Sequence, residues 1–393
     1  MRNRNWKSFC VLACILALFV GSPGEAAEQV LRYNLAGEPK TLDPTINSEL
    51  YAGFIIEHCF EGLLRDRNGE LVPGIAESWE ISEDGKTYTF HLRDAQWSDG
   101  KPVTAKDFEY AWKRVIDPAA GSSYAYIFYC IEGAEARYTA DGKPEDVGVA
   151  AKDDKTLVVE LANPTPYFLS LAAFMAYRPV RSDVVEANPE TWANSAATYL
   201  SNGPYVLKEY SAAGTVLEKN PSYWNASEVK LPRIETSFIT EASTEMAAFE
   251  SGELDILENI PAAEMERISK MEGFAAFPQI VTYFYTLNTE KKPLDDVRVR
   301  KALALAVDRK ALVEKVLQGA DIPAINVVAR GLKDSTGKDF SETAGDFGLD
   351  PAGAARPDEA RKLLAEAGFP EGKGFPELTL LYNTNEALKQ HAE

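Results

Sequence analysis

The sequence contains few of the side chains that most often hold metal ions. It has three histidines and four cysteines among 393 residues. The histidines, His58, His91 and His391, are scattered, and there is no Cys-x-x-Cys pair and no Cys/His cluster. Structural and catalytic zinc sites need such closely spaced ligands. We therefore expect neither a metal site nor a cofactor.

The sequence also lacks a recognisable catalytic motif. His91 lies near Ser98 and Asp99, the residue types of a nucleophilic triad. However, no nucleophile elbow surrounds Ser98, and Ser98-Asp99-Gly100 is typical of a turn. We therefore expect that the protein is not an enzyme, and a secreted hydrolase is only a distant alternative.

Basic side chains are in deficit. There are 41 lysines and arginines against 60 aspartates and glutamates, which gives a formal net charge of −19 at pH 7. Nucleic acids and anionic membrane surfaces attract positively charged proteins. The charge therefore argues against a nucleic-acid partner and against binding to an anionic membrane.

The most apolar run lies at the N-terminus and is too short to span a bilayer, which takes about 20 residues. This run, Phe9–Val20, follows a basic segment and precedes the helix-breaking stretch Gly21–Gly24. The pattern is that of a secretory signal peptide. We expect residues 1–26 to be removed by cleavage after Ala26, so that the mature chain is periplasmic or extracytoplasmic and is not inserted in the membrane.

A lipoprotein is the alternative for this N-terminus. Cys14 follows Val11-Leu12-Ala13, which would allow anchoring through its sulfur, but little apolar sequence precedes it. Two further cysteines, Cys59 and Cys130, remain in the mature chain. An oxidising compartment permits a disulfide between them. Both also lie in apolar runs where a buried free thiol is equally expected.

The stretch from Glu61 to Val115 is the most informative part of the chain. Residues Thr87–Leu92 alternate and are rich in β-formers, which predicts a half-buried strand. Thr104 is a candidate helix N-cap with Asp107 at the capping-box position. Apolar residues follow at helical spacing and predict a core-facing helix; they are Phe108, Ala111, Trp112 and Val115.

Further elements are predicted along the rest of the chain. A β-hairpin is expected from two β-rich runs on either side of the turn Ser211–Gly214. Other strands are expected at Gln29–Leu35, Thr282–Asn288 and Glu377–Tyr382. Long helical periodicity, with Asp295 as its cap and Gly319 at its end, predicts a helix over Val297–Gln318.

Several sequence motifs occur in an order that resembles a known family. They are EGLL, PGIAESW, YTFHLR and WSDGKPVTAKDF within residues 61–115, then Asp117-Pro118, GPYVLKEYSAAGTVLEKNPSYW and DVRVRKALALAVDRKAL. The set is similar to the solute-binding proteins of peptide ABC importers, extracellular solute-binding protein family 5. The resemblance is closest to the oligopeptide-binding branch.

The resemblance implies an α/β fold of the periplasmic-binding-protein type. This fold is a two-lobed clam of type II with an accessory domain, and hinge closure holds the ligand between the lobes. The implied domains are a large lobe from residues 27–60 and 184–280, an accessory domain from 61–183, and a second lobe from 281–393. Members of this family extend further, so the chain resembles a C-terminally truncated member with an incomplete second lobe.

The implied function is that of an extracytoplasmic receptor of an ABC importer. Such a receptor binds short peptides and delivers them to the transmembrane subunits of the permease, and we expect it to be a monomer. Relatives within the family bind other solutes, so dipeptides, murein peptides, nickel and oligosaccharides are alternatives.

Receptors of this kind hold an extended peptide as an added β-strand, through backbone hydrogen bonds. By resemblance, the pairing segment is Ser48, Glu49 and Leu50, and Tyr124 lines the cleft. The second lobe is expected to contribute Phe284 and Thr286, which period two places on one face of the predicted strand, and the pocket residue Asn383. Packing in the core is an equally good interpretation of the two aromatic residues. The family's aspartate anchor for the peptide amine is expected beyond residue 393.

Overall fold

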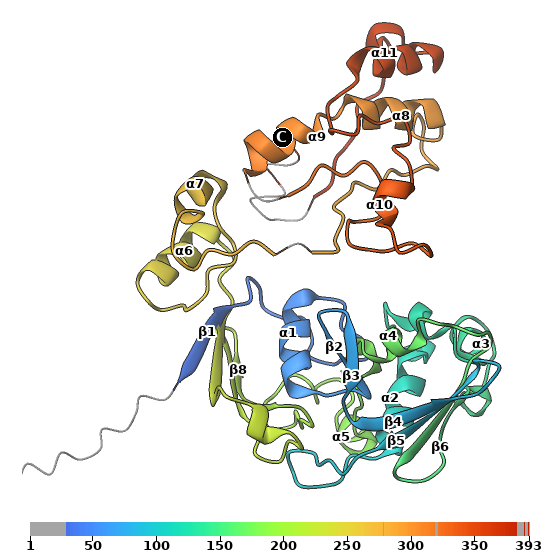
Figure 1. Cartoon of the computed structure of the whole chain (residues 1–393), viewed down its shortest axis with the longest axis vertical. Helices are drawn as coiled ribbons and strands as arrows, with labels where there is room; N and C mark the ends of the chain where they lie inside the picture. The colour runs from blue at the N-terminus through green and yellow to red at the C-terminus, as the bar shows by residue number, and fades with distance from the viewer. Residues whose placement is uncertain (1–28, 278, 319–320, 383–388, 390–391, 393) are drawn as a thin grey trace, which may run out of the picture.

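The computed structural model of the protein describes residues 29–277, 279–318 and 321–382, together with residues 389 and 392. Figure 1 shows a lower part that contains the β-sheets and the helices α1 to α5. Helices α6 and α7 lie above its left-hand end, over β1 and β8, and α8 to α11 form an upper part. The fold is therefore mixed α/β, and its sheets are concentrated in the lower part.

The first sheet joins segments that lie far apart in the sequence. Its strand order is β1-β10-β9-β8, where β1 pairs in parallel with β10 and the other pairs are antiparallel. The strands are β1 (Val30–Asn34), β8 (Tyr205–Ser211), β9 (Gly214–Lys219) and β10 (Arg233–Ser237). The hairpin β8–β9 confirms the one predicted from the sequence.

The second four-stranded sheet lies within residues 76–160. Its order is β4-β5-β7-β6, and every pair is antiparallel. The strands are β4 (Ala76–Ile81), β5 (Thr87–Leu92), β6 (Val149–Ala151) and β7 (Thr156–Glu160). Alternate residues of β5 are buried, which confirms the predicted half-buried strand. A separate two-stranded hairpin consists of β2 (Leu64–Arg67) and β3 (Glu70–Pro73).

Helix α2 (Ala105–Val115) begins as its sequence predicts. The Asp107 carboxylate accepts hydrogen bonds from the backbone amide of Thr104 at 2.8 Å and from its hydroxyl at 3.2 Å. These bonds satisfy donors that the first turn of a helix leaves unpaired. The four predicted core residues are buried where α2 packs on β6 and β7; they are Phe108, Ala111, Trp112 and Val115.

The other helices are short. They are α1 (Leu50–Cys59), α3 (Ala134–Thr139), α4 (Phe168–Ala172), α5 (Ser182–Ala187), α6 (Ala242–Glu250), α7 (Met265–Ile268), α8 (Val297–Ala306), α9 (Arg309–Ala311), α10 (Phe340–Thr343) and α11 (Pro357–Glu366). A continuous hydrophobic core runs through the lower part, from Leu35 to Ile234 in the sequence. Within it Phe60 packs edge-on against Trp97 and Tyr199.

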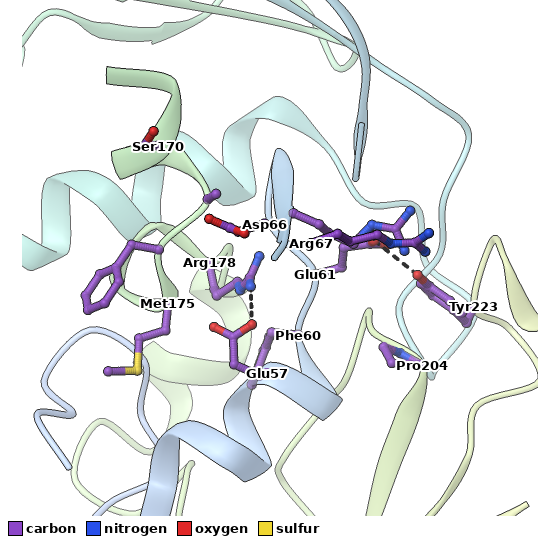
Figure 2. A pocket seen from close by; sticks show the side chains of 13 residues that line it. Glu57, Phe60, Glu61, Asp66, Arg67, Ser170, Met175, Arg178, Pro204 and Tyr223 are labelled. Carbon is purple, nitrogen blue, oxygen red and sulfur yellow. Dashed lines mark hydrogen bonds and ion pairs between the residues drawn. The ribbon is translucent and has the colours of Figure 1, made fainter. Parts of the chain in front are cut away.

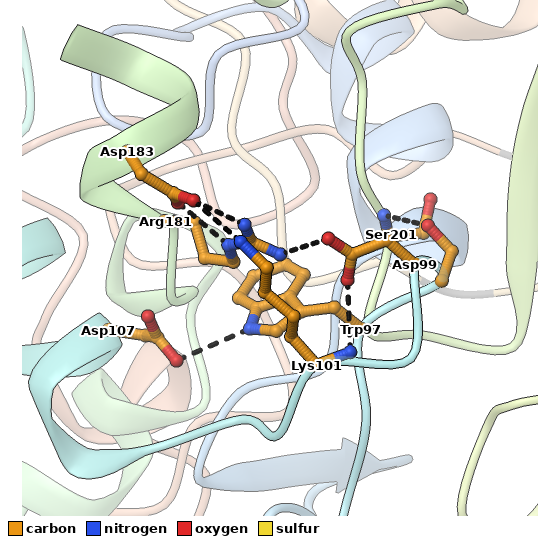
Figure 3. Close-up of polar contacts among 8 residues, drawn as sticks. Trp97, Asp99, Lys101, Asp107, Arg181, Asp183 and Ser201 are labelled. Atoms are coloured by element: carbon orange, nitrogen blue, oxygen red, sulfur yellow. Dashed lines mark hydrogen bonds and ion pairs between the residues drawn. The ribbon is translucent and has the colours of Figure 1, made fainter. Parts of the chain in front are cut away.

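The turn Ser98–Gly100 has a structural role, and Figure 3 shows its residue Asp99 pointing towards Arg181. The Ser98 amide donates to the Ser201 carbonyl at 2.7 Å, and the Ser201 amide donates to the Ser98 hydroxyl at 3.1 Å. The neighbouring Asp99 carboxylate accepts from Arg181 at 2.5 Å, and Arg181 also binds Asp183. Hydrogen bonds from Arg181 lower the pKa of Asp183 well below its ordinary value. These contacts tie the second sheet region to residues 181–201.

Three predictions for the C-terminal third are wrong. Residues Thr282–Asn288 and Glu377–Tyr382 form no strand. Phe284 and Thr286 therefore do not share one face of a strand. A strand needs a neighbour that pairs with its amide and carbonyl groups. No such pairing partner is present for either segment within the described residues.

The predicted helix over Val297–Gln318 is interrupted. Helix α8 begins after Asp296, one residue later than the predicted cap, and ends at Ala306. Val307 is extended, and Asp308 starts a new helical segment by accepting a hydrogen bond from the Ala311 amide at 2.8 Å. That segment, α9, continues into a π-helical turn, Leu312–Leu317. The second cap divides the apolar periodicity into two elements.

Both cysteines in the described part of the chain are free thiols, with Cys59 buried and Cys130 partly buried. Of the two possibilities that the sequence leaves open, the structure has the free thiols. Within the described residues, no helix is both long enough and apolar enough to cross a membrane.

Candidate functional site

The segment Ser48–Leu50 leads into α1, whose first residue is Leu50, and is held in place by Asn47. The buried Asn47 side chain accepts from the Glu49 amide at 3.0 Å and donates to the Glu49 carbonyl at 3.0 Å. Glu49 has an extended backbone, with φ −108° and ψ 141°. Ser48 is exposed and its backbone groups have no hydrogen-bond partner in the described structure. The Glu49 amide and carbonyl are therefore occupied, whereas the free backbone groups of Ser48 can pair with another extended chain.

The side chain of Glu49 is occupied elsewhere. Its carboxylate forms an ion pair with the Lys40 ammonium at 2.7 Å and accepts from the Lys40 amide at 3.0 Å. Partial burial raises the pKa of Glu49, but the hydrogen bonds from Lys40 outweigh this and lower it overall. The adjacent Leu50 side chain is 87% exposed. The segment therefore presents its backbone and one apolar side chain.

Tyr124 lies close to this segment through two intermediate residues. The Asn47 amide nitrogen is 3.4 Å from the Met175 sulfur. The preceding residue, Phe174, packs edge-on against Tyr124, with ring centroids 5.0 Å apart and an interplanar angle of 78°. Tyr124 is half-buried. Two of the groups predicted from the sequence, residues 48–50 and Tyr124, thus belong to one region of the lower part.

The remaining predicted residues do not join this region. The Phe284 side chain is 64% exposed and Thr286 is also exposed, both on the segment that leads from α7 to the upper helices (Figure 1). Among the described residues, no hydrogen bond or ring contact joins either side chain to Tyr124 or to residues 48–50. Asn383 lies outside the described residues.

Sequence reasoning missed a cavity of about 500 Å³ beside Phe174 and Met175 (Figure 2). At its wall the guanidinium of Arg178, whose side chain is only 4% exposed, pairs with the Glu57 carboxylate of α1. The position of Arg178 directly after the apolar run Phe174–Tyr177 is the sequence signal that could have identified this buried arginine. A cation in such a run is rarely buried without a partner.

A second buried charge lies at the same cavity. The Glu61 carboxylate is 3.0 Å from Arg65 and accepts hydrogen bonds from the Tyr223 hydroxyl at 3.1 Å and from the Trp224 indole. Burial raises the pKa of Glu61, and Arg65 opposes that shift. The Glu61 backbone also exchanges two hydrogen bonds with the Asn202 side chain. The carboxylate is therefore fully occupied by the protein's own donors.

The geometry does not form a catalytic triad. His91 is exposed on β5, with its Nε2 3.6 Å from the Glu80 carboxylate, and the Ser98 hydroxyl bonds to the Ser201 amide. Within the residues that the structure describes, no three His, Cys, Asp or Glu side chains lie together in a way that could hold a metal ion.

Comparisons with known proteins agree with the fold. Residues 70–393 match the family model of bacterial extracellular solute-binding proteins, family 5, middle region. The chain is 40% identical over 385 residues to the oligopeptide-binding protein OppA of Bacillus subtilis (strain 168), which covers 95% of this chain and 70% of that protein. It is 36% identical over 374 residues to the periplasmic murein peptide-binding protein MppA of Escherichia coli (strain K12), covering 92% and 67%.

The structural comparison leads to the same group. The crystal structure of Haemophilus influenzae OppA in complex with RPPGFSPFR matches with a TM-score of 0.83 and 34% identity, over 93% of this chain and 72% of that chain. The match confirms the expected α/β binding-protein fold with two lobes, and the sequence identity confirms the resemblance to the oligopeptide branch. The proteins of this family are substrate-binding receptors of transporters rather than enzymes. The chain therefore belongs to family 5 of the bacterial extracellular solute-binding proteins.

Proposed function

We propose that this protein is the extracytoplasmic receptor of an ABC importer and that it binds short peptides between its two lobes. The observation that carries this proposal is the free backbone of Ser48 next to the extended Glu49, which Asn47 holds in place in the same region as Tyr124. A peptide can add to this segment as a further β-strand. Backbone pairing gives affinity with little dependence on sequence, which suits a receptor for mixed peptides.

The individual roles in binding follow from this arrangement. The segment of Ser48, Glu49 and Leu50 pairs with the peptide backbone through Ser48, and the exposed side of the Tyr124 ring contacts a peptide side chain. Phe284, Thr286 and Asn383 contact the ligand from the second lobe when the lobes close. The closed receptor, which acts as a monomer, then delivers the peptide to the transmembrane subunits of the permease.

The domain division predicted from the sequence supports this mechanism. We propose a large lobe from residues 27–60 and 184–280, an accessory domain from 61–183 and a second lobe from 281–393. The first sheet draws its strands only from the two large-lobe segments, and the second sheet lies entirely within the accessory domain. The continuous core across both, around Phe60 and Trp97, makes them one rigid part against which the second lobe can move.

Export is part of the same proposal. Residues 1–26 act as a cleavable signal peptide, and the mature protein begins near Ala27. N-terminal sequencing of the secreted protein should find this start. Lipid labelling that depends on Cys14 would favour the lipoprotein alternative, and retention of the uncleaved segment in the cytoplasm would contradict export.

Calorimetric titration tests the ligand class. The purified protein is titrated in turn with mixed tripeptides to pentapeptides, dipeptides, a murein tripeptide, an oligosaccharide and Ni²⁺. We expect heat from the short peptides and none from the sugar or the metal. Binding of sugar or Ni²⁺ with no response to any peptide would overturn the proposal.

A further inference from the structure

The cavity beside Phe174 and Met175 has a buried cation at its wall (Figure 2). Arg178 lies on the chain just after the short turn Met175–Tyr177, and its side chain is 4% exposed. Phe174 and Met175 line the cavity and also contact Tyr124 and Asn47, respectively. The cavity therefore adjoins the proposed peptide-binding segment.

The guanidinium of Arg178 has more donors than its neighbours use. One Nη pairs with Glu57, and the other has a long contact of 3.4 Å to the Leu64 carbonyl. The Nε is buried and has no hydrogen-bond partner in the part of the chain that the structure describes. A guanidinium carries five N–H donors, and buried donors are normally paired. The unpaired N–H groups of Arg178 can therefore donate hydrogen bonds to a further anionic group.

The fold makes room for this guanidinium. A Cβ atom at Gly62 would lie 2.5 Å from an Nη of Arg178, so a side chain at that position would displace it. Gly62 also accepts a hydrogen bond from the Ile75 amide through its carbonyl, which fixes the backbone there. The space around Arg178 is thus built by neighbouring backbone as well as by side chains.

Among the described residues, the other acidic groups at the cavity form no hydrogen bond or ion pair with Arg178, although the charge of Arg178 helps to lower the pKa of the nearby Glu61 against the effect of burial. Glu61 is neutralised by Arg65, and Asp66 accepts a hydrogen bond from the Gly69 amide at 2.6 Å. Glu57, the one carboxylate that reaches Arg178, has a side chain 45% exposed and is shared with solvent. A carboxylate that enters the cavity would find Arg178 ready to bind it in a planar, two-point arrangement.

We propose that this cavity accepts a carboxylate group through Arg178, and that a bound peptide supplies it as an acidic side chain. The inference rests on the proposed peptide-binding function. It adds a preference for acidic ligands to a receptor whose backbone pairing is otherwise indifferent to sequence. The volume of about 500 Å³ is sufficient for a glutamate side chain.

Matched peptides test the proposal. Alanine pentapeptides carrying a single glutamate or a single glutamine are compared at each of the five positions by calorimetry. We expect one position where glutamate binds about tenfold more tightly, in line with a charge-assisted hydrogen bond. Arg178→Gln should abolish that preference and leave the affinity of the glutamine peptides unchanged. Glu57→Gln should increase the preference, because it removes the competing carboxylate.

Two further variants keep the test decisive if Arg178→Gln does not fold. Ser170→Glu places a carboxylate at the cavity lining while Arg178 remains, and should also abolish the preference. Arg67→Gln changes an exposed arginine of the same lining and should have no effect. Equal losses from Arg178→Gln and Arg67→Gln would mean a general charge effect and would overturn the proposal.

Thermal shift with succinate distinguishes a carboxylate supplied by a peptide from one supplied by a free carboxylic acid. A shift that Arg178→Gln removes, without any preference among peptides, supports the cavity as a site for a free carboxylic acid. Peptide binding with no preference and no succinate shift overturns the inference and leaves the peptide receptor intact. Failure of every peptide to bind contradicts the proposed function instead.

Discussion

The lower and upper parts of the molecule differ in how they bury apolar side chains. The lower part has one continuous core with fully buried aromatic residues such as Trp112, Phe128 and Tyr177. The second core cluster, in the upper part, contains only Ala302, Leu305 and Ala360, with partly buried leucines around them. Meanwhile Phe277, Phe284 and other large apolar residues after residue 270 are exposed. Apolar side chains of both parts are therefore buried in a large core only where strands and helices from several segments pack together.

Amide hydrogen exchange should show the largest difference between the two parts. Strand β5 is paired on both sides and alternate residues are buried, so its amides open only with the core. Residues 377–382 form no strand and are exposed. We expect exchange in β5 to be slower by a factor of about 10⁴ or more, as for global against local opening. Comparable protection in the two segments would contradict the comparison.

A pair of leucine truncations should measure the same difference in stability. Leu157 of β7 is fully buried, and Leu364 of α11 is only partly buried against the second core cluster. We expect Leu157→Ala to lower the free energy of unfolding by about 2–5 kcal/mol, through lost burial and a cavity. Leu364→Ala should cost about 1 kcal/mol or less, because its surface is already partly hydrated.

Urea denaturation followed by tryptophan fluorescence and circular dichroism would check the two values. All six tryptophans lie outside residues 225–393, so fluorescence reports mainly on the lower part. A larger loss for Leu364→Ala than for Leu157→Ala would show that the upper part is the more cooperative unit.

Loss of the Asn47 side chain, which holds the Glu49 backbone, should have a smaller, local effect on peptide binding. Asn47→Ala removes both hydrogen bonds that hold the Glu49 backbone, and each such bond contributes about 0.5–1.5 kcal/mol. We expect peptide affinity to fall about tenfold in calorimetric titration. Lys40→Ala removes only the exposed ion pair with Glu49 and should change affinity less than twofold. Equal losses in the two variants would argue against a role for Asn47 in positioning the peptide-pairing segment.

The smallest expected effect concerns the ion pair between Arg181 and Asp183. The pKa of Asp183 is lower in the folded protein than its ordinary value of 3.8, so its ionised form stabilises the fold. This contribution is fully present above pH of about 4 and is lost as the pH falls towards the folded-state pKa. Since Asp183 is 55% exposed, we expect less than about 1 kcal/mol.

Urea midpoints between pH 2 and pH 6 measure this effect. The difference between the wild-type protein and Asp183→Asn should be largest near pH 6 and should shrink with acid. Glu80→Gln, at an exposed pair with His91, serves as a control with a negligible effect in this range. A difference that grows towards low pH would show the opposite sign of coupling.

Local signals in the sequence were sufficient to predict the secondary structure at residues 87–92 and 104–115. The alternation of Thr87–Leu92 predicted β5 with its observed bounds, and Thr104 with Asp107 predicted the start of α2. Both depend on contacts within a few residues or on a single buried face. The strand predicted at Thr282–Asn288 did not form, because its β-forming residues have no neighbouring strand to pair with in the described structure.

The candidate site also contains some residues that the sequence predicted and others that only the structure identified. Residues 48–50 and Tyr124 were identified from the family motifs, and their proximity through Asn47, Met175 and Phe174 required the fold. The pair of Arg178 with Glu57 was not predicted, because these residues are 121 positions apart and have no local relation. Charge partners at that separation are chosen by packing rather than by spacing.

The sequence by itself determined the family, the export signal as an expectation, the capped helix α2 and the hairpin β8–β9, since each is encoded by neighbouring residues. Only the tertiary structure decided that β1 pairs with β10, that Cys59 and Cys130 stay apart as thiols, and that Arg178 lies buried beside a cavity. The physical reason is that burial and pairing depend on surfaces brought together from distant segments, and no local pattern specifies which surfaces meet.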